Sequence, residues 1–131
     1  MPGESIVPES WISKSLAYTL EIDESELTPE HFELFGGEAL LIATAFFNQG
    51  KGDVHPQLAK IMFEAMNNAY VATHNPLNPE FNQFPTHAHA AVIEPALKRA
   101  LEPLDMGRVY DESSLENIYD TIYQILEPIL D

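Results

Sequence analysis

The sequence predicts an all-α protein, a single compact bundle of about four to five helices with one long Asn- and Pro-rich loop over residues 73–86. Two observations favour this class. Apolar residues recur three and four positions apart along several segments, which is the spacing of one helix face. The 131 residues, 45% of them hydrophobic, are enough for one core. We therefore expect one helical domain over residues 1–131, in which residues 1–9 form a flexible N-terminal tail.

The segment 10–22 fits two patterns. One set of its apolar residues alternates as in a β-strand, whereas Ile12, Leu16 and Leu20 mark one face of a helix. A single strand would have no partner in an otherwise helical chain. We therefore expect a helix here.

Residues 28–50 form the next predicted helix, with Thr28 as a suitable N-cap. Gly36 and Gly37 weaken its middle by about 1 kcal/mol each, so the segment is either one kinked helix or two helices. Residues 39–47 are apolar on nearly all sides and are expected to be the central buried element.

Segments 55–75 and 113–130 show the clearest helical periodicity. The apolar face of the first contains Leu58, Ile61, Met62, Ala65 and Ala69. The apolar face of the second contains Leu115, Ile118, Ile122, Ile125 and Ile129. Ser113 and Glu116 have the spacing of a capping box, so we expect Ser113 to cap the last helix.

The fourth predicted helix covers residues 86–104 and contains Pro95, where it should either begin or kink. The loop over residues 73–86 precedes this helix. It is longer than usual connections between helices and carries Phe81 and Phe84. The two rings either pin the loop to the core or belong to a functional loop.

The acidic residues are concentrated at the two ends of the chain. Net charge is −15, and residues 41–100 contribute none of it because their four acids and four bases balance. Such a surface should repel nucleic acid and anionic membranes, and it should attract a basic protein. The simpler interpretation is that the charge serves solubility alone.

An acidic line follows the last predicted helix. Its members are Glu112, Glu116, Asp120 and Glu127, Asp111 stands directly before it, and no lysine occurs from 109 to 131. Like charges four positions apart destabilise a helix by about 0.2–0.5 kcal/mol per pair, so stability alone does not favour this arrangement. We predict that these acids, together with Phe81 and Phe84, bind a basic protein partner. The alternative is an ordinary solvated face.

The histidines are candidates for metal ligands. His87 and His89 are two positions apart, which places them about 200° apart on a helix rather than on one side. His74 would have to join them, and nothing in the sequence brings the three together. We therefore expect no metal and no cofactor.

Enzymatic motifs are missing from the sequence. It has no His-Glu-x-x-His, no phosphate-binding glycine loop and no Gly-x-Ser-x-Gly. It also has no cysteine, no secretory signal and no apolar stretch that could span a membrane. We expect a cytoplasmic protein that is not an enzyme and does not bind nucleic acid directly.

These observations lead to a functional hypothesis. The protein is expected to be a small acidic binding module, such as an inhibitor, an immunity protein or a nucleic-acid mimic, that captures a basic partner. One alternative is a helical homodimer or larger homo-oligomer with a structural or adaptor role. Another is a small-molecule or metal-binding domain that uses the loop over residues 73–89.

Overall fold

The computed structural model describes residues 7–49, 53–73 and 86–130, and for residues 73, 86–89 and 130 it describes the backbone only. These parts are all-α, as the sequence predicts, and contain no strand. The helices are α1 (Glu9–Leu20), α2 (Pro29–Gln49), α3 (Pro56–Thr73), α4 (Thr86–Leu101) and α5 (Glu112–Leu130), with a short 3-10 helix, η1 (Glu24–Glu26).

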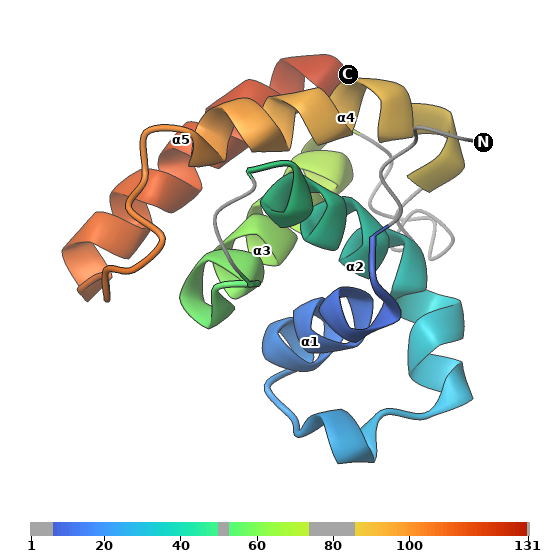
Figure 1. Ribbon diagram of the computed structural model, residues 1–131. Coiled ribbons are helices and arrows are strands. Elements are labelled where there is room, and N and C mark those ends of the chain that lie inside the picture. Colours follow the sequence, from blue (N-terminus) through green and yellow to red (C-terminus); the bar gives the residue numbers. More distant parts are fainter. Residues whose placement is uncertain (1–6, 50–52, 74–85, 131) are drawn as a thin grey trace.

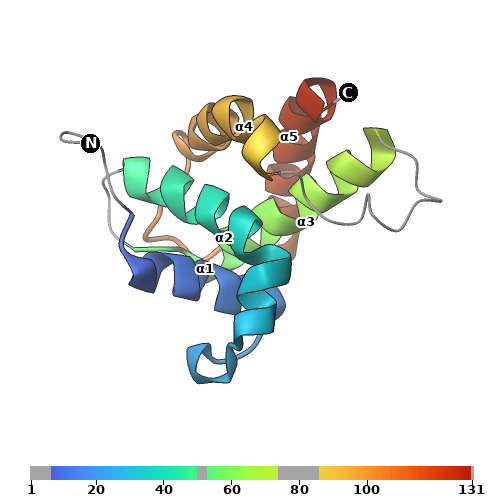
Figure 2. The same ribbon diagram turned by 90° about the vertical axis from the view of Figure 1, so that its right-hand side faces the viewer.

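The helices are arranged in three levels (Figures 1 and 2). α2 and α3 form the middle level; α1 packs below both of them, and α4 and α5 lie above. The largest contact is between α3 and α5, and α4 packs mainly on α2. Among the described helices α5 packs mainly on α3 and α4, and its outer side is exposed.

The core lies where the apolar faces of these helices meet. Residues at most 2% exposed include Leu16, Leu41, Ile42, Phe46, Leu58, Met62, Met66, Ile93, Leu97, Leu101, Ile122 and Leu126. The expected face of α3 is confirmed for Leu58 and Met62, and that of α5 for Ile122. The segment 39–47 is central but not buried on all sides, because Leu40 is 43% exposed.

The expected start of α2 is confirmed. The Thr28 hydroxyl accepts a hydrogen bond from the His31 backbone N–H (3.3 Å), and the Thr28 N–H donates to His31 Nδ1 (3.0 Å). This reciprocal pair has the form of a capping box in which histidine replaces the usual glutamate. It satisfies the N–H groups at the helix start.

Two expected interruptions do not end a helix. α2 continues through Gly36 and Gly37, although Figures 1 and 2 show that it changes direction along its length. α4 begins at Thr86 and continues through Pro95, which lies on its exposed side. The helix expected over 10–22 is also confirmed, as α1.

The expected cap of α5 is wrong. The helix begins at Glu112, and Asp111 Oδ1 accepts the Ser114 backbone N–H at 2.8 Å. Asp111 therefore takes the capping position, and Ser113 lies inside the first turn. A carboxylate at this position both accepts the free N–H and complements the positive end of the helix dipole.

The connection from α4 to α5 is fastened to the start of α3. Gln57 Nε2 donates to the Tyr110 carbonyl, and Gln57 Oε1 accepts the Tyr110 N–H, both at 3.0 Å. His55 Nε2 lies 2.9 Å from the Arg108 carbonyl oxygen. These contacts hold the residues just before α5 against the start of α3.

Candidate protein-binding surface

The acidic face of α5 consists of Glu112, Glu116, Asp120 and Glu127. All four side chains are exposed, and Glu116, Asp120 and Glu127 lie on the side of α5 away from the buried Ile122. In the described part of the chain the ion pairs are Lys14–Asp53 and Lys60–Glu21, so none of these four carboxylates forms one. The acidic face therefore directs negative charge into solvent without an internal counter-charge.

Asp111 is exposed but differs from these four acids. Its pKa is lowered by the hydrogen bonds from the Ser114 backbone and side chain. Its carboxylate therefore stabilises the start of α5 while it remains exposed, and a role in partner binding stays a prediction.

A groove between α3 and α5 lies along one edge of the acidic face, and we call it the acidic groove. It is about 380 Å³ in volume and is lined by Ile61, Glu64, Glu112, Leu115, Glu116 and Tyr119. Half-buried Ile61 and Leu115 provide apolar surface among three exposed carboxylates. Such a groove suits a long cationic side chain, whose methylene groups pack on apolar surface while its charge meets the carboxylates.

Two tyrosines lie along the same edge of α5. The rings of Tyr119 and Tyr123 stack with centroids 6.1 Å apart and an interplanar angle of 22°. The Tyr119 hydroxyl accepts a hydrogen bond from Asn68 Nδ2 on α3 at 2.6 Å. Burial, and then the nearby Glu127 carboxylate, raise the pKa of Tyr123. Tyrosine is common in protein interfaces, and the sequence analysis did not single out this pair.

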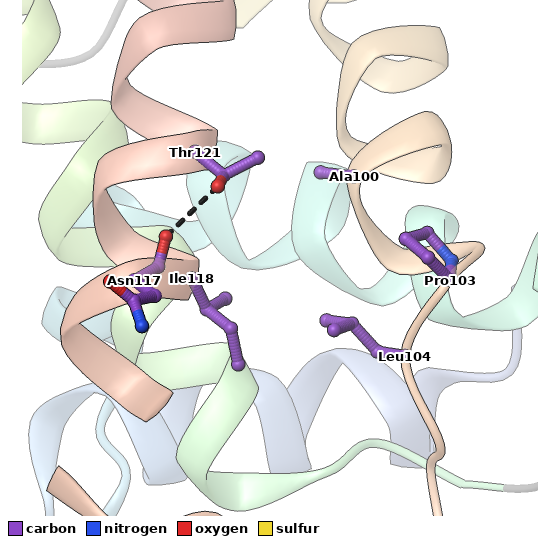
Figure 3. A pocket seen from close by; sticks show the side chains of 6 residues that line it. All are labelled: Ala100, Pro103, Leu104, Asn117, Ile118 and Thr121. Atoms are coloured by element: carbon purple, nitrogen blue, oxygen red, sulfur yellow. Dashed lines mark hydrogen bonds between the residues drawn. The ribbon is translucent and has the colours of Figure 1, made fainter. Parts of the chain in front are cut away.

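A second hollow, the α4–α5 pocket, lies on the other flank of α5 (Figure 3). It is about 150 Å³ in volume. Its walls are Ala100, Pro103 and Leu104 from the end of α4 and the turn after it, and Asn117, Ile118 and Thr121 from α5. The acidic face therefore lies between two hollows that both contain apolar side chains.

The other predicted site residues lie wholly or partly outside what the structure describes. His74, Phe81 and Phe84 lie outside the described residues. His87 and His89 are in the first part of α4, and their side chains also lie outside the description. In the part of the chain that is described, no three His, Asp or Glu side chains are placed to hold a metal ion.

Glu38 is a titratable residue that the sequence analysis did not single out. It lies on α2, is only 2% exposed, and its Oε2 atom has no hydrogen-bond partner. Burial raises its pKa to about 8, against a smaller opposing effect of a hydrogen bond with Asn67. The carboxyl is therefore mostly neutral at pH 7 and belongs to the core. Its position on the inner side of α2, in line with Leu41 and Ile42, was the available sequence signal.

Fold and surface together define a small all-α protein with an acidic helix face between two hollows. Comparisons with protein-family models, curated proteins and solved structures found no match for this chain. Among the helices of residues 7–49, 53–73 and 86–130, none has the length and apolar character needed to cross a membrane.

Proposed function

We propose that this protein is a small binding module that captures a basic protein partner through the acidic face of α5. Inhibitors, immunity proteins and nucleic-acid mimics of this kind present carboxylates to a cationic surface. The observation that carries the proposal is the acidic groove, where Glu64, Glu112 and Glu116 line one hollow with apolar side chains between them.

The spacing of the carboxylates on α5 favours a binding partner that carries positive charge. Glu112, Glu116 and Asp120 follow one another at intervals of four, which is unfavourable for an isolated helix. A cation from a partner would remove that repulsion. Complementary charge also accelerates association and excludes partners of the wrong sign.

The lining of the acidic groove suggests that this cation is a side chain of a protein. A lysine or arginine side chain uses both parts of the acidic groove, because its stem packs on Ile61 and Leu115 while its charged end reaches the carboxylates. Tyr119 adds an aromatic ring to the same lining. Nucleic acid carries the opposite charge and would be repelled. Since the chain has no cysteine and needs no oxidising compartment, we propose the cytoplasm as its location.

A homodimer through the apolar faces of 58–69 and 115–129 is not supported. Those faces pack on each other within one chain, where Leu58, Met62 and Ile122 are at most 1% exposed. A second copy could reach them only if α3 and α5 separated.

The test compares two double charge reversals. Glu116→Lys with Asp120→Lys changes the acidic face, and Glu30→Lys with Glu33→Lys changes two exposed acids of α2 by the same total charge. Each protein is immobilised, exposed to a lysate of the source cells and eluted with a salt gradient. We expect the wild type and the α2 variant to retain the same basic protein until moderate salt, and the α5 variant to lose it.

The result that contradicts the proposal is equal behaviour of the two variants. If both lose the partner, net charge alone attracts it and the face has no special role. If both retain it, the binding surface lies elsewhere on the molecule.

A further inference from the structure

We infer that the partner inserts one apolar side chain of leucine or phenylalanine size into the α4–α5 pocket while its cationic groups meet the acidic face of α5. The recognised segment is therefore both basic and apolar. This inference rests on the proposed function and specifies the chemistry of the partner.

The pocket is built to receive apolar atoms. Ala100, Leu104 and Ile118 provide hydrocarbon walls. The polar group of Thr121 is already used, because its hydroxyl donates to the Asn117 carbonyl at 2.9 Å within α5 (Figure 3). Figure 3 also shows the Thr121 methyl group turned toward Ala100. A side chain from the partner would thus meet mainly methyl and methylene groups, with the exposed Asn117 amide also in the lining.

The size of the pocket restricts the guest. Its volume is about 150 Å³, and an apolar cavity of about that volume holds a benzene molecule. A single leucine or phenylalanine side chain is of this scale. Interfaces commonly gain much of their affinity from one such side chain held in a pocket and surrounded by polar contacts.

The carboxylates beside the pocket favour apolar ligands that also carry positive charge. The two α5 residues at its rim, Asn117 and Thr121, directly follow Glu116 and Asp120 in the sequence. On a helix this places a carboxylate about 100° around the axis from each rim residue, on the solvent side. An anionic amphiphile such as a fatty acid would be repelled there. A basic protein segment with an apolar side chain satisfies both parts of the surface.

The two hollows also set a spacing within that segment. They flank one helix, whose diameter with side chains is about 10–12 Å. An extended segment covers that distance in about three residues, at roughly 3.3 Å per residue. A helical segment needs about seven, at 1.5 Å per residue. The cation in the acidic groove and the apolar side chain in the α4–α5 pocket should therefore be three residues apart in an extended partner or seven apart in a helical one.

The experiment selects peptides from a displayed random library on the immobilised full chain at low salt. We expect enriched peptides to share lysine or arginine and one leucine or phenylalanine at one of these two spacings. The best peptide is then synthesised, together with a version in which alanine replaces the apolar residue. With the wild-type protein, that replacement should weaken binding about tenfold or more.

Two variants of the protein locate the apolar contact. Thr121→Leu fills the rim of the α4–α5 pocket, and Gln124→Leu adds the same side chain at an exposed α5 position outside the pocket lining. Thr121→Leu should weaken binding of the peptide about as much as the alanine replacement in the peptide does. Gln124→Leu should leave affinity unchanged. The peptide with alanine is measured on the wild-type protein, so it tests the apolar contact even if Thr121→Leu disturbs the helix.

The outcomes separate this inference from the proposed function. Basic peptides without an apolar residue, or equal effects of Thr121→Leu and Gln124→Leu, overturn the apolar contact and leave the electrostatic proposal standing. Peptides without basic residues, or affinity unchanged by Glu116→Lys with Asp120→Lys, overturn both. A library that enriches no peptide at low salt also counts against both.

Discussion

The Asp111 carboxylate accepts the backbone N–H of Ser114 at 2.8 Å, and this bond starts α5. The sequence predicts the same carboxylate as a partner-binding group. The bond explains why its pKa is lowered while it remains exposed. Asp111 therefore differs from the acidic face of α5 in having a hydrogen bond that caps the helix.

Replacing Asp111 with alanine should lower the thermal midpoint at pH 7, because the Ser114 N–H loses its acceptor. The pKa of Asp111 is lowered in the fold, so its contribution is present above its ordinary value of 3.8. That contribution is lost as the pH falls through the lowered folded pKa. The measurement is thermal unfolding of both proteins across this acidic range.

Ser113→Ala is the matched control for that substitution. If Ser113 capped the helix, Ser113→Ala would lower the thermal midpoint more than Asp111→Ala does. Because Ser113 lies in the first turn instead, alanine should leave the midpoint nearly unchanged. A larger drop in the thermal midpoint from Ser113→Ala than from Asp111→Ala would support the capping box expected from the sequence.

Glu38 should make the protein less stable as the pH rises. Its folded pKa is raised to about 8 from an ordinary 4.5, so its full contribution is present below 4.5 and is lost as the pH rises through 8. The loss across this window should be on the order of a few kcal/mol. Urea unfolding at pH 5, 7 and 8.5 measures it.

Glu38→Gln should flatten that pH dependence, because the amide stays neutral and has a similar shape. The control is Glu33→Gln, an exposed glutamate on the same helix, which should follow the wild-type curve. Identical slopes for wild type and Glu38→Gln would place the titrating group elsewhere.

Gln57→Ala should destabilise the fold by about 1–3 kcal/mol, because it leaves the N–H and the carbonyl of Tyr110 without their partner. Chemical denaturation gives the difference. Gln124→Ala, at an exposed position of α5, is the comparison and should cost much less. Equal effects would mean that the connection from α4 to α5 does not depend on this pair.

Leu58→Ala and Ile122→Ala should each cost about 2–5 kcal/mol, since both side chains are at most 1% exposed where α3 and α5 meet. Thr121→Ala, one residue from Ile122 on the exposed side, should cost much less. The free energies of unfolding would contradict this core if the buried and exposed substitutions had similar effects.

The sequence by itself determined which segments are helices and which of their sides are apolar. These properties depend on residues three or four positions apart and on local capping groups, so they can be deduced without knowing any neighbour. Thr28 at the start of α2 and Ile122 on the inner side of α5 are two examples. The exposure of Glu116 and Asp120 follows from the same periodicity, because they lie opposite the apolar side.

Only the tertiary structure decided what lies beside each helix. Glu64 and Glu112 are far apart in sequence, and they line one groove because α3 packs on α5. The α4–α5 pocket exists because the end of α4 meets α5 at Ile118. Burial among neighbouring helices raises the pKa of Glu38 to about 8. Hollows and pKa shifts arise from groups brought together across the chain, whereas periodicity describes one helix at a time.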